Sequence, residues 1–384
     1  MTRIAIALAA LVAAATDAGA HARSVSYSAW TLDGVDATVR VRIAQLDASA
    51  LAAGSGIGPN LQNQLRLFAG GEFCPPERAS FRELDAEPGW VVREWTVRCA
   101  ASAGPWRVRS DLLVDVVPGH VHFARVGTAD RALVLNETVR DGAVSADGGG
   151  PGQYVTLGIE HIASGRDHLV FLLALVLLGG ALRRVAAVVT GFTIGHSVTL
   201  ALAVLGWATP DGRTVEALIG LSIVLIAVEN VWLAEGRRQV VLPVVAVVGT
   251  IALAVVAATS DGGASPLALC GVALFAACYF SLLARAARPE RLRWGVASLF
   301  GLVHGFGFAG VLRGTALPAD GVVGALLGFN AGVEVGQLMV LALLWPVVAL
   351  LSHRGAGARL ALVQSGSTFA TCAGCYWVVS RILS

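Results

Sequence analysis

The chain has 384 residues, of which 55% are hydrophobic and only 14% are charged, and all of its 28 basic residues are arginine. Soluble proteins carry about 25% charged residues, so this composition excludes a disordered chain, a coiled coil and a single soluble globule. A formal net charge of +2 is too small for a nucleic-acid-binding protein. We therefore expect a polytopic α-helical membrane protein.

Residues 1–22 have the pattern of a secretory signal peptide. Arg3 supplies the positive charge, and the apolar run that follows covers residues 4–15. This run is shorter than the roughly 20 residues that a transmembrane helix needs. A first transmembrane helix is the alternative interpretation. Small residues at alternate positions predict cleavage after Ala20 or Ala22.

Residues 23–146 predict a small extracytoplasmic domain with an antiparallel β-sandwich fold. Apolar and polar residues alternate along 39–43, 95–99 and 106–116. A period of two residues is typical of strands with one buried face. We therefore expect a separate folded domain ahead of the membrane part of the chain.

Four residues of this domain are candidates for covalent or metal chemistry. Cys74 and Cys99 are its only cysteines. Behind a signal peptide they favour one disulfide, with two buried thiols as the alternative. His120 and His122 share one face of a strand, which predicts an exposed strand face or, alternatively, an entry site for a metal ion.

A glycine-rich linker at 147–154 leads into the membrane domain, 155–384, where eight apolar stretches predict eight transmembrane helices. The stretches are 155–182, 185–206, 214–234, 240–258, 264–284, 293–312, 321–351 and 360–383. The predicted inner loops contain ten arginines and the outer loops and tail contain three. This bias places both mature ends outside the bacterial inner (cytoplasmic) membrane.

Ionisable side chains inside these stretches are costly and mark a functional site. His161 and His168 are two helical turns apart in the first stretch, so we expect them to share one face of a single helix, with Glu160 and Asp167 on the adjacent stripe. His196, His304 and Glu334 are expected near the middle of their own helices. Imidazoles bind nickel, cobalt, copper or zinc, and carboxylates complete or orient such a site. A buried ion network around Arg166 and Asp167 is the alternative.

Other polar residues in the predicted helices are interpreted as groups that orient the ligands or continue an ion path. They are Glu160, Ser197, Glu229, Asn230 and Gln337. Four glycines in the seventh stretch recur at every fourth position, from Gly324 to Gly336. Such a stripe predicts a close approach of another helix.

Five motifs resemble the HupE/UreJ family of hydrogenase and urease accessory membrane proteins, which are regarded as nickel or cobalt permeases. The motifs are GIEHIASGRDHL at 158–169, FTIGHSVTL at 192–200, EN at 229–230, LVHGFGFA at 302–309 and FNAGVEVGQ at 329–337. The resemblance covers residues 155–384. Within the family, the chain is most similar in arrangement to the branch that carries an extracytoplasmic β-domain ahead of the helices. It implies a metal role for His161, Asp167 and His168, and for His196 and His304 in the other polar helix motifs.

The primary hypothesis is therefore a permease or accessory protein for a divalent transition metal, with nickel or cobalt as the expected ion and zinc or copper as alternatives. The expected ligands are His161, Asp167, His168, His196, His304 and Glu334. The alternatives are an intramembrane metal-dependent hydrolase assisted by Ser197, and a membrane-anchored sensor or assembly factor. Expected partners are the metal ion and the lipid bilayer. A second copy of the chain and a protein of metalloenzyme maturation are further candidate partners.

Overall fold

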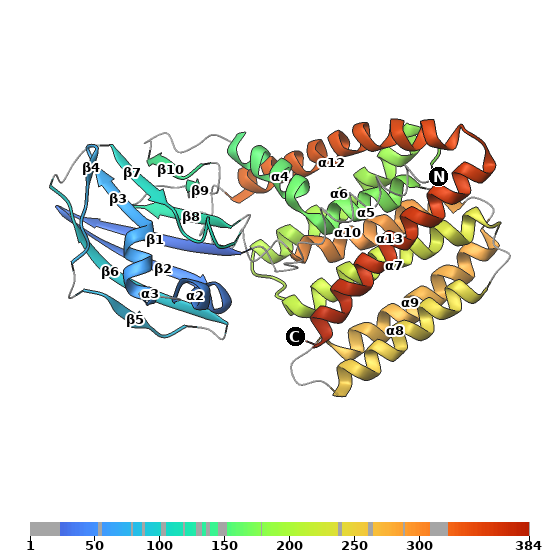
Figure 1. Cartoon of the computed structure of the whole chain (residues 1–384), viewed down its shortest axis with the longest axis horizontal. Helices are drawn as coiled ribbons and strands as arrows, with labels where there is room; N and C mark the ends of the chain where they lie inside the picture. The colour runs from blue at the N-terminus through green and yellow to red at the C-terminus, as the bar shows by residue number, and fades with distance from the viewer. Residues whose placement is uncertain are drawn as a thin grey trace. The chain divides into compact units, whose positions relative to one another are not determined.

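In the computed structural model (Figure 1) the strands and two short helices come first along the chain and the longer helices follow, and the chain forms two compact units. The predicted signal peptide and most of the glycine-rich linker lie outside the described residues. The structure describes residues 24–52, 56–77, 80–86, 89–100, 105–117, 120–127, 133–135, 139–144, 152–177, 179–236, 240–259, 264–286, 289–307 and 322–383.

The strands of the first unit form two sheets. One sheet has the order β5-β6-β2-β1-β8-β9, with β5 at Arg82–Leu84, β6 at Trp90–Arg98, β2 at Asp36–Ala44, β1 at Val25–Asp33, β8 at Val121–Val126 and β9 at Leu133–Leu135. The other has the order β10-β7-β3-β4, with β10 at Asp141–Val144, β7 at Trp106–Ser110, β3 at Leu65–Ala69 and β4 at Glu72–Phe73. Two short helices, α2 at Gln45–Ala52 and α3 at Ile57–Gln64, follow β2.

The inward faces of both sheets meet in one hydrophobic core. Val39, Val41 and Ile43 of β2 alternate with outward-facing residues and pack in the same cluster as Leu67 of β3 and Val108 of β7. Alternation at a period of two residues therefore predicted the buried faces correctly. All strand pairings are antiparallel among the described strands except one, because β1 and β8 run parallel.

Three sequence predictions for this unit can be compared directly with the structure. Cys74 and Cys99 form a disulfide. The predicted strand over 106–116 is wrong beyond Ser110, because Leu113 adopts a left-handed φ of 57° and the chain turns there. The exposed strand face predicted for His120 and His122 is also wrong, because the two side chains are only 3% and 1% exposed.

Nine helices from residue 152 onward form the second unit in the described residues. They are α4 at Gly152–Ser164, α5 at Arg166–Leu177, α6 at Leu182–Val204, α7 at Gly212–Ala234, α8 at Val241–Thr259, α9 at Pro266–Arg285, α10 at Pro289–Gly307, α12 at Val322–Ser352 and α13 at Ala356–Leu383. Five of these, α6, α7, α8, α9 and α12, are long and apolar enough to cross a membrane. Eight spans are not confirmed, because α10 and α13 do not meet this criterion and the first predicted span is two short helices.

Glycines allow two helix pairs to approach closely. A β-carbon at Gly195 of α6 would lie 2.0 Å from the carbonyl oxygen of Ser298 of α10, and one at Gly301 of α10 would lie 2.0 Å from that of Phe192. Successive glycines of α6 meet successive turns of α10 in the same order, so these helices run parallel. Gly332 approaches Val155 of α4 in the same way. Gly332 and Gly336 of the predicted glycine stripe therefore lie against α4, whereas Gly324 meets nothing within 4 Å.

Apolar side chains also cover the outside of the helical unit. Val244, Val248 and Val255 of α8 and Leu327 and Leu343 of α12 are among the exposed large hydrophobic residues. Water would not tolerate such extended apolar faces, whereas acyl chains solvate them. The helical unit is thus the multi-pass membrane part of the protein, and the chain combines it with a β domain.

Candidate metal centre

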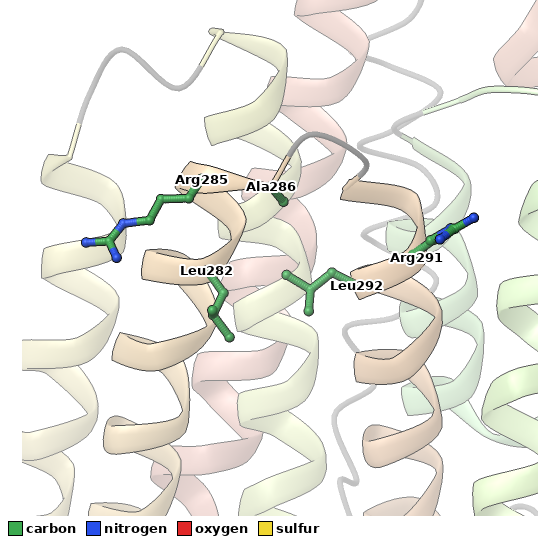
Figure 2. A pocket seen from close by; sticks show the side chains of 5 residues that line it. All are labelled: Leu282, Arg285, Ala286, Arg291 and Leu292. Atoms are coloured by element: carbon green, nitrogen blue, oxygen red, sulfur yellow. The ribbon is translucent and has the colours of Figure 1, made fainter.

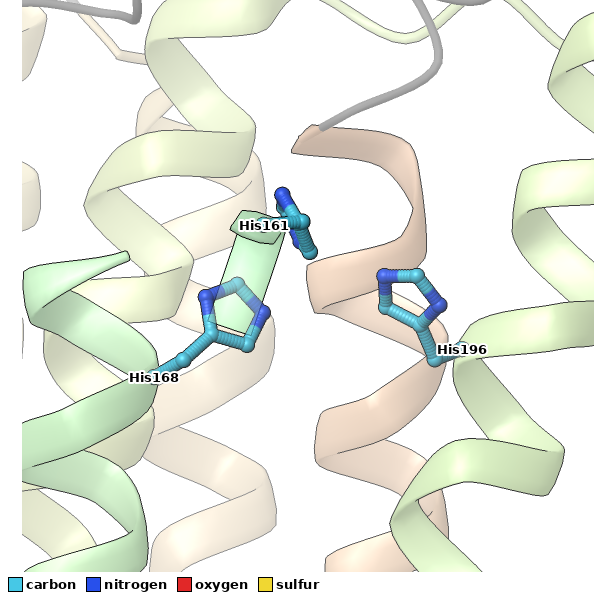
Figure 3. Close-up of side chains that lie close together, drawn as sticks. All are labelled: His161, His168 and His196. Atoms are coloured by element: carbon cyan, nitrogen blue, oxygen red, sulfur yellow. The ribbon is translucent and has the colours of Figure 1, made fainter. Parts of the chain in front are cut away.

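Three histidines from three helices converge inside the helical unit (Figure 3). His161 comes from α4, His168 from α5 and His196 from α6, and one ring nitrogen of each lies within 4.8 Å of the others. The side chains are 7%, 4% and 0% exposed. Neutral imidazole offers one lone pair to a metal ion. The cluster therefore presents three nitrogen donors to a single point that bulk water does not reach.

A one-residue interruption at Gly165 separates α4 from α5 and sets His161 against His168, with ring centroids 4.6 Å apart. A β-carbon at Gly165 would lie 2.7 Å from the carbonyl oxygen of His161 and 2.9 Å from Nδ1 of His168. No other residue fits there without a shift of the site. The prediction of one continuous helix carrying both rings on one face is wrong, because the rings meet across a break.

Asp167 orients His168 rather than joining the three nitrogens. Its Oδ1 lies 3.1 Å from Nδ1 of His168, so Nδ1–H donates to the carboxylate when the ring is neutral. The lone pair then resides on Nε2, which is buried and has no hydrogen-bond partner in the part of the chain that the structure describes. A carboxylate on the far nitrogen is the usual way in which a protein fixes the tautomer of a metal-binding histidine.

His304 of α10 is a fourth imidazole beside the cluster. Its ring centroid lies 5.3 Å from that of His168. Nδ1–H donates to the carbonyl oxygen of Phe300 at 2.9 Å, which leaves the lone pair on Nε2, buried and without a partner among the described residues. His304 lies on α10, fourth from the last residue that the structure describes for this helix.

Aromatic rings surround the imidazoles. The ring centroids of Phe192 and Phe171 lie 4.9 Å and 5.1 Å from that of His304, and Phe329 lies 5.4 Å from His161. Sequence reasoning did not assign these phenylalanines to the site, although Phe192 and Phe300 each precede a histidine by four residues. An aromatic cage excludes water, and ion–ligand interactions are stronger in the resulting low dielectric.

Glu334 belongs to a separate polar group between α12 and α6. Its two carboxylate oxygens accept hydrogen bonds from Thr190 at 2.6 Å and from Thr193 at 2.5 Å. The Thr193 hydroxyl also lies 2.7 Å from Oε1 of the buried Gln337. Thr193 precedes His196 by about one helical turn. Glu334 and Gln337 therefore contact Thr193, one helical turn from His196, and not the histidine rings themselves.

Asn330 shares α12 with Glu334 and was missed as a candidate in the sequence. It precedes Glu334 by one turn on α12, and its side-chain amide donates to the carbonyl oxygen of Leu326 at 2.8 Å within that helix. The motif FNAGVEVGQ contains both residues. Their spacing of four would have placed them on one helix face.

The structure does not bring Glu229 and Asn230 to the histidines. Glu229 of α7 forms an ion pair with Arg293 at 2.7 Å, and Asn230 donates to the carbonyl oxygen of Ala174 at 2.6 Å. Arg293 and His304 are eleven residues apart on α10, which is about 16 Å along the helix axis. The pair therefore lies well away from the cluster.

Two further candidate residues lie next to histidines in the sequence but not in a ligating position. Ser197 donates its hydroxyl proton to the carbonyl oxygen of Thr193 at 2.7 Å, inside its own helix. Glu160 is half-buried on α4, one residue before His161. Neither side chain belongs to the group whose ligand atoms lie within 4.8 Å of one another.

A hollow of about 520 Å³ opens between the end of α9 and the start of α10 (Figure 2). Leu282 and Leu292 point into it, whereas Arg285 and Arg291 point away from it to either side. This surface hollow shares no residue with the histidine cluster. The buried cluster, rather than this hollow, is where His161, His168 and His196 converge.

The sequence profile described as HupE / UreJ protein matches residues 141–260 and 267–381, which is more than half of the chain. The matched residues include all four histidines described above, together with Asp167 and Glu334. A comparison with curated proteins yields no match. The chain thus belongs to the HupE/UreJ family of membrane proteins.

Proposed function

We propose that this HupE/UreJ protein is a permease for a divalent transition metal, with nickel or cobalt as the substrate. The observation that carries the proposal is the convergence of His161, His168 and His196 within 4.8 Å at a buried point of the helical unit. His304 supplies a fourth nitrogen during passage, and Asp167 fixes the orientation of His168. Family membership also favours a permease or accessory role over catalysis.

The donor set favours borderline metals. Imidazole nitrogens suit nickel, cobalt, copper and zinc, whereas calcium and magnesium prefer oxygen ligands. The three clustered ligands are all imidazoles, so a hard cation would bind them weakly. Nickel and cobalt are the ions that agree with both the ligand chemistry and the family. Zinc and copper are the alternatives to be compared in the same assay.

The helix interruption supports transport rather than hydrolysis. α4 and α5 contain 13 and 12 residues, or about 20 and 18 Å of helix, whereas the apolar core of a bilayer is about 30 Å thick. Transporters commonly place substrate sites where two such half-helices meet. Ser197, which would assist a hydrolase, already donates its proton within α6.

A polar route leads away from the histidines along α6 and α12. His196 is completely buried, Thr193 is buried, Glu334 is half-buried and Thr190 is exposed. Thr190 and Thr193 both donate hydrogen bonds to Glu334, and Thr193 precedes His196 by about one helical turn. We propose that the ion leaves the nitrogen donors along this line of oxygens. The arginine bias of the predicted loops favours a cytoplasmic position for this end of α6.

Metal uptake into proteoliposomes tests the proposal. The full chain should accumulate nickel or cobalt, and elemental analysis of the purified protein should find bound metal. His168→Ala should lose both. His353→Ala is the matched control, because His353 is exposed beyond α12 and should leave uptake unchanged. Normal uptake and metal content in folded His168→Ala protein would exclude this site.

A further inference from the structure

A chain of buried side chains runs along the seam between β1 and β8. Its members are linked in the order Asp47, Ser24, His120, Ser26, His122, Ser28 and Trp30. Each of the six links is between 2.5 and 3.1 Å long. Each histidine therefore uses both of its ring nitrogens in hydrogen bonds to serines.

The strand geometry explains why the residues alternate. Ser26, Ser28 and Trp30 are every second residue of β1, so they share one face of the sheet. The parallel register pairs Ser26 with His122, and His120 immediately precedes β8, two residues before His122. Side chains on the same face of neighbouring strands lie in contact. Each imidazole is thereby placed between two serine hydroxyls.

Chemistry at the two ends fixes the direction of every hydrogen bond. The indole of Trp30 can only donate, and the ionised carboxylate of Asp47 can only accept. Ser24 donates to Asp47, so Nδ1–H of His120 must donate to Ser24, and Nε2 must accept from Ser26. The same argument makes His122 donate from Nδ1 and accept from Ser28 at Nε2. Both rings are neutral Nδ1–H tautomers.

The surroundings of the chain are otherwise apolar. Ile43 and Val41 of β2 lie opposite Ser26 and Ser28, and Leu135 of β9 lies opposite His122. Asp47 of α2 is the charged side chain that contacts the chain in the described residues. Burial lowers the pKa of His120 to about 4 and that of His122 to about 3. Fully hydrogen-bonded and buried, the two rings are not available to a metal ion.

A second proton on either ring breaks the arrangement. If Nε2 of His120 gained a proton, it would become a donor that faces the Ser26 hydroxyl. Ser26 now donates its own proton to this Nε2, so that hydroxyl proton would be left without an acceptor. A buried donor without an acceptor and a buried positive charge are both unfavourable. Opening the seam between β1 and β8 relieves both, because the imidazoles then reach water.

We propose that this series of hydrogen-bonded side chains is an acid-sensitive clasp. By this we mean that it holds β1 against β8 while both histidines are neutral and lets the two strands separate when the histidines gain protons. The seam is the one parallel pairing among the described strands. Its opening divides the first sheet between β5-β6-β2-β1 and β8-β9. The clasp involves the β unit alone and does not depend on the proposed metal transport.

The sign of the pH effect follows from proton binding. In the open seam the histidines regain a pKa of about 6.5, so the open state binds more protons below that pH. The closed seam is fully stable above about pH 6.5 and loses stability as the pH falls toward the lower values of the closed state. At pH 5 each histidine favours opening by about 30-fold, and the two together by about 1,000-fold.

Hydrogen–deuterium exchange of the full chain in lipid nanodiscs measures the opening. Exchange at pH 7.5 and pH 5.0 is corrected for the intrinsic rate of amide exchange. Peptides from β1 and β8 should lose protection by up to about 1,000-fold at the lower pH, whereas peptides from β3 and β7 of the second sheet should change far less. Unchanged protection of β1 and β8, or equal loss in both sheets, would overturn the proposal.

Variants assign the effect to the two rings. A neutral amide has one donor and one acceptor side, so the double variant His120→Gln, His122→Gln should keep the seam closed at both pH values. His353→Gln is the matched control and should retain the wild-type pH dependence. A double variant that still opens at pH 5 would overturn the assignment to these histidines.

Two measurements cover the case in which the double variant does not fold. Ser26→Ala removes the hydroxyl between both rings and should expose β1 and β8 to exchange already at pH 7.5. Nitrogen NMR of wild-type protein labelled at histidine should find Nδ1–H tautomers for His120 and His122 at neutral pH. Nε2–H tautomers for both, or undiminished protection in Ser26→Ala, would show that no directed chain exists.

Discussion

Removing Arg293 should destabilise the helical unit far more than removing its whole ion pair. Glu229 and Arg293 are in contact at 2.7 Å, and their side chains are only 3% and 14% exposed. Arg293 also donates to Asn230 at 3.3 Å. Arg293→Ala leaves the Glu229 carboxylate buried without its cation. Breaking a buried pair in this way typically costs about 3 to 5 kcal/mol.

The double variant Glu229→Met, Arg293→Met removes both charges and keeps the volume. Apolar replacement of a complete buried pair is often neutral, so we expect the double variant to lie within about 1 kcal/mol of the wild type. Arg293→Ala should then be the less stable protein even though it carries one substitution fewer. Equilibrium unfolding of the full chain in mixed detergent micelles measures these differences.

The same variants show whether Glu229 belongs to the ion path. The pair lies about 16 Å along α10 from His304, so the double methionine variant should bind nickel as the wild type does. A double variant as unstable as Arg293→Ala would contradict the burial argument. A stable double variant without metal binding or uptake would instead return Glu229 to the path that the sequence suggested.

Three further predictions concern the cluster and the β unit. Gly165→Ala should weaken nickel binding measured by isothermal titration calorimetry, because its β-carbon would lie 2.7 Å from a carbonyl oxygen. Gly249→Ala is the control and should leave the affinity unchanged, because its β-carbon would meet nothing within 4 Å. Equal affinities of the two variants would refute the role of the helix break. Metal affinity should fall between about pH 7.5 and 5.5, since protons compete for imidazole nitrogens, and His161→Gln with His168→Gln should remove most of this dependence; a flat wild-type profile would favour carboxylate ligands. Reducing the disulfide, whose cysteines are 25 residues apart, should destabilise the β unit by about 3 to 4 kcal/mol, and an unfolding curve insensitive to reductant would contradict this.

Local patterns were sufficient to predict the two parts of the chain. Apolar stretches of spanning length identified α6, α7, α8, α9 and α12, since a bilayer imposes length and composition on each helix separately. Alternation identified the buried face of β2 for a similar reason, because each strand shows its own period. The motifs of the membrane part were also sufficient to recognise the HupE/UreJ family.

Helix interruptions and pairings were not visible in the same way. Residues 155–182 appeared to be one span, but α4 and α5 are separated at Gly165, where a β-carbon would lie 2.7 Å from the carbonyl oxygen of His161 and 2.9 Å from Nδ1 of His168. His120 and His122 appeared to be exposed, because alternation identifies two strand faces but not which one is covered. Their burial depends on the neighbouring strand β1, which is almost a hundred residues earlier.

The sequence by itself determined the class of the protein, its family and the residue types that could hold a metal, because composition, periodicity and motif are local properties. The tertiary structure alone decided which of those residues meet. It gathered three histidines from separate helices, moved Glu334 to the threonines of α6 and paired Glu229 with Arg293. Distances between helices depend on side-chain packing across the whole bundle, here on the glycines at which α6 meets α10 and α4 meets α12, and spacing along one helix carries no information about them.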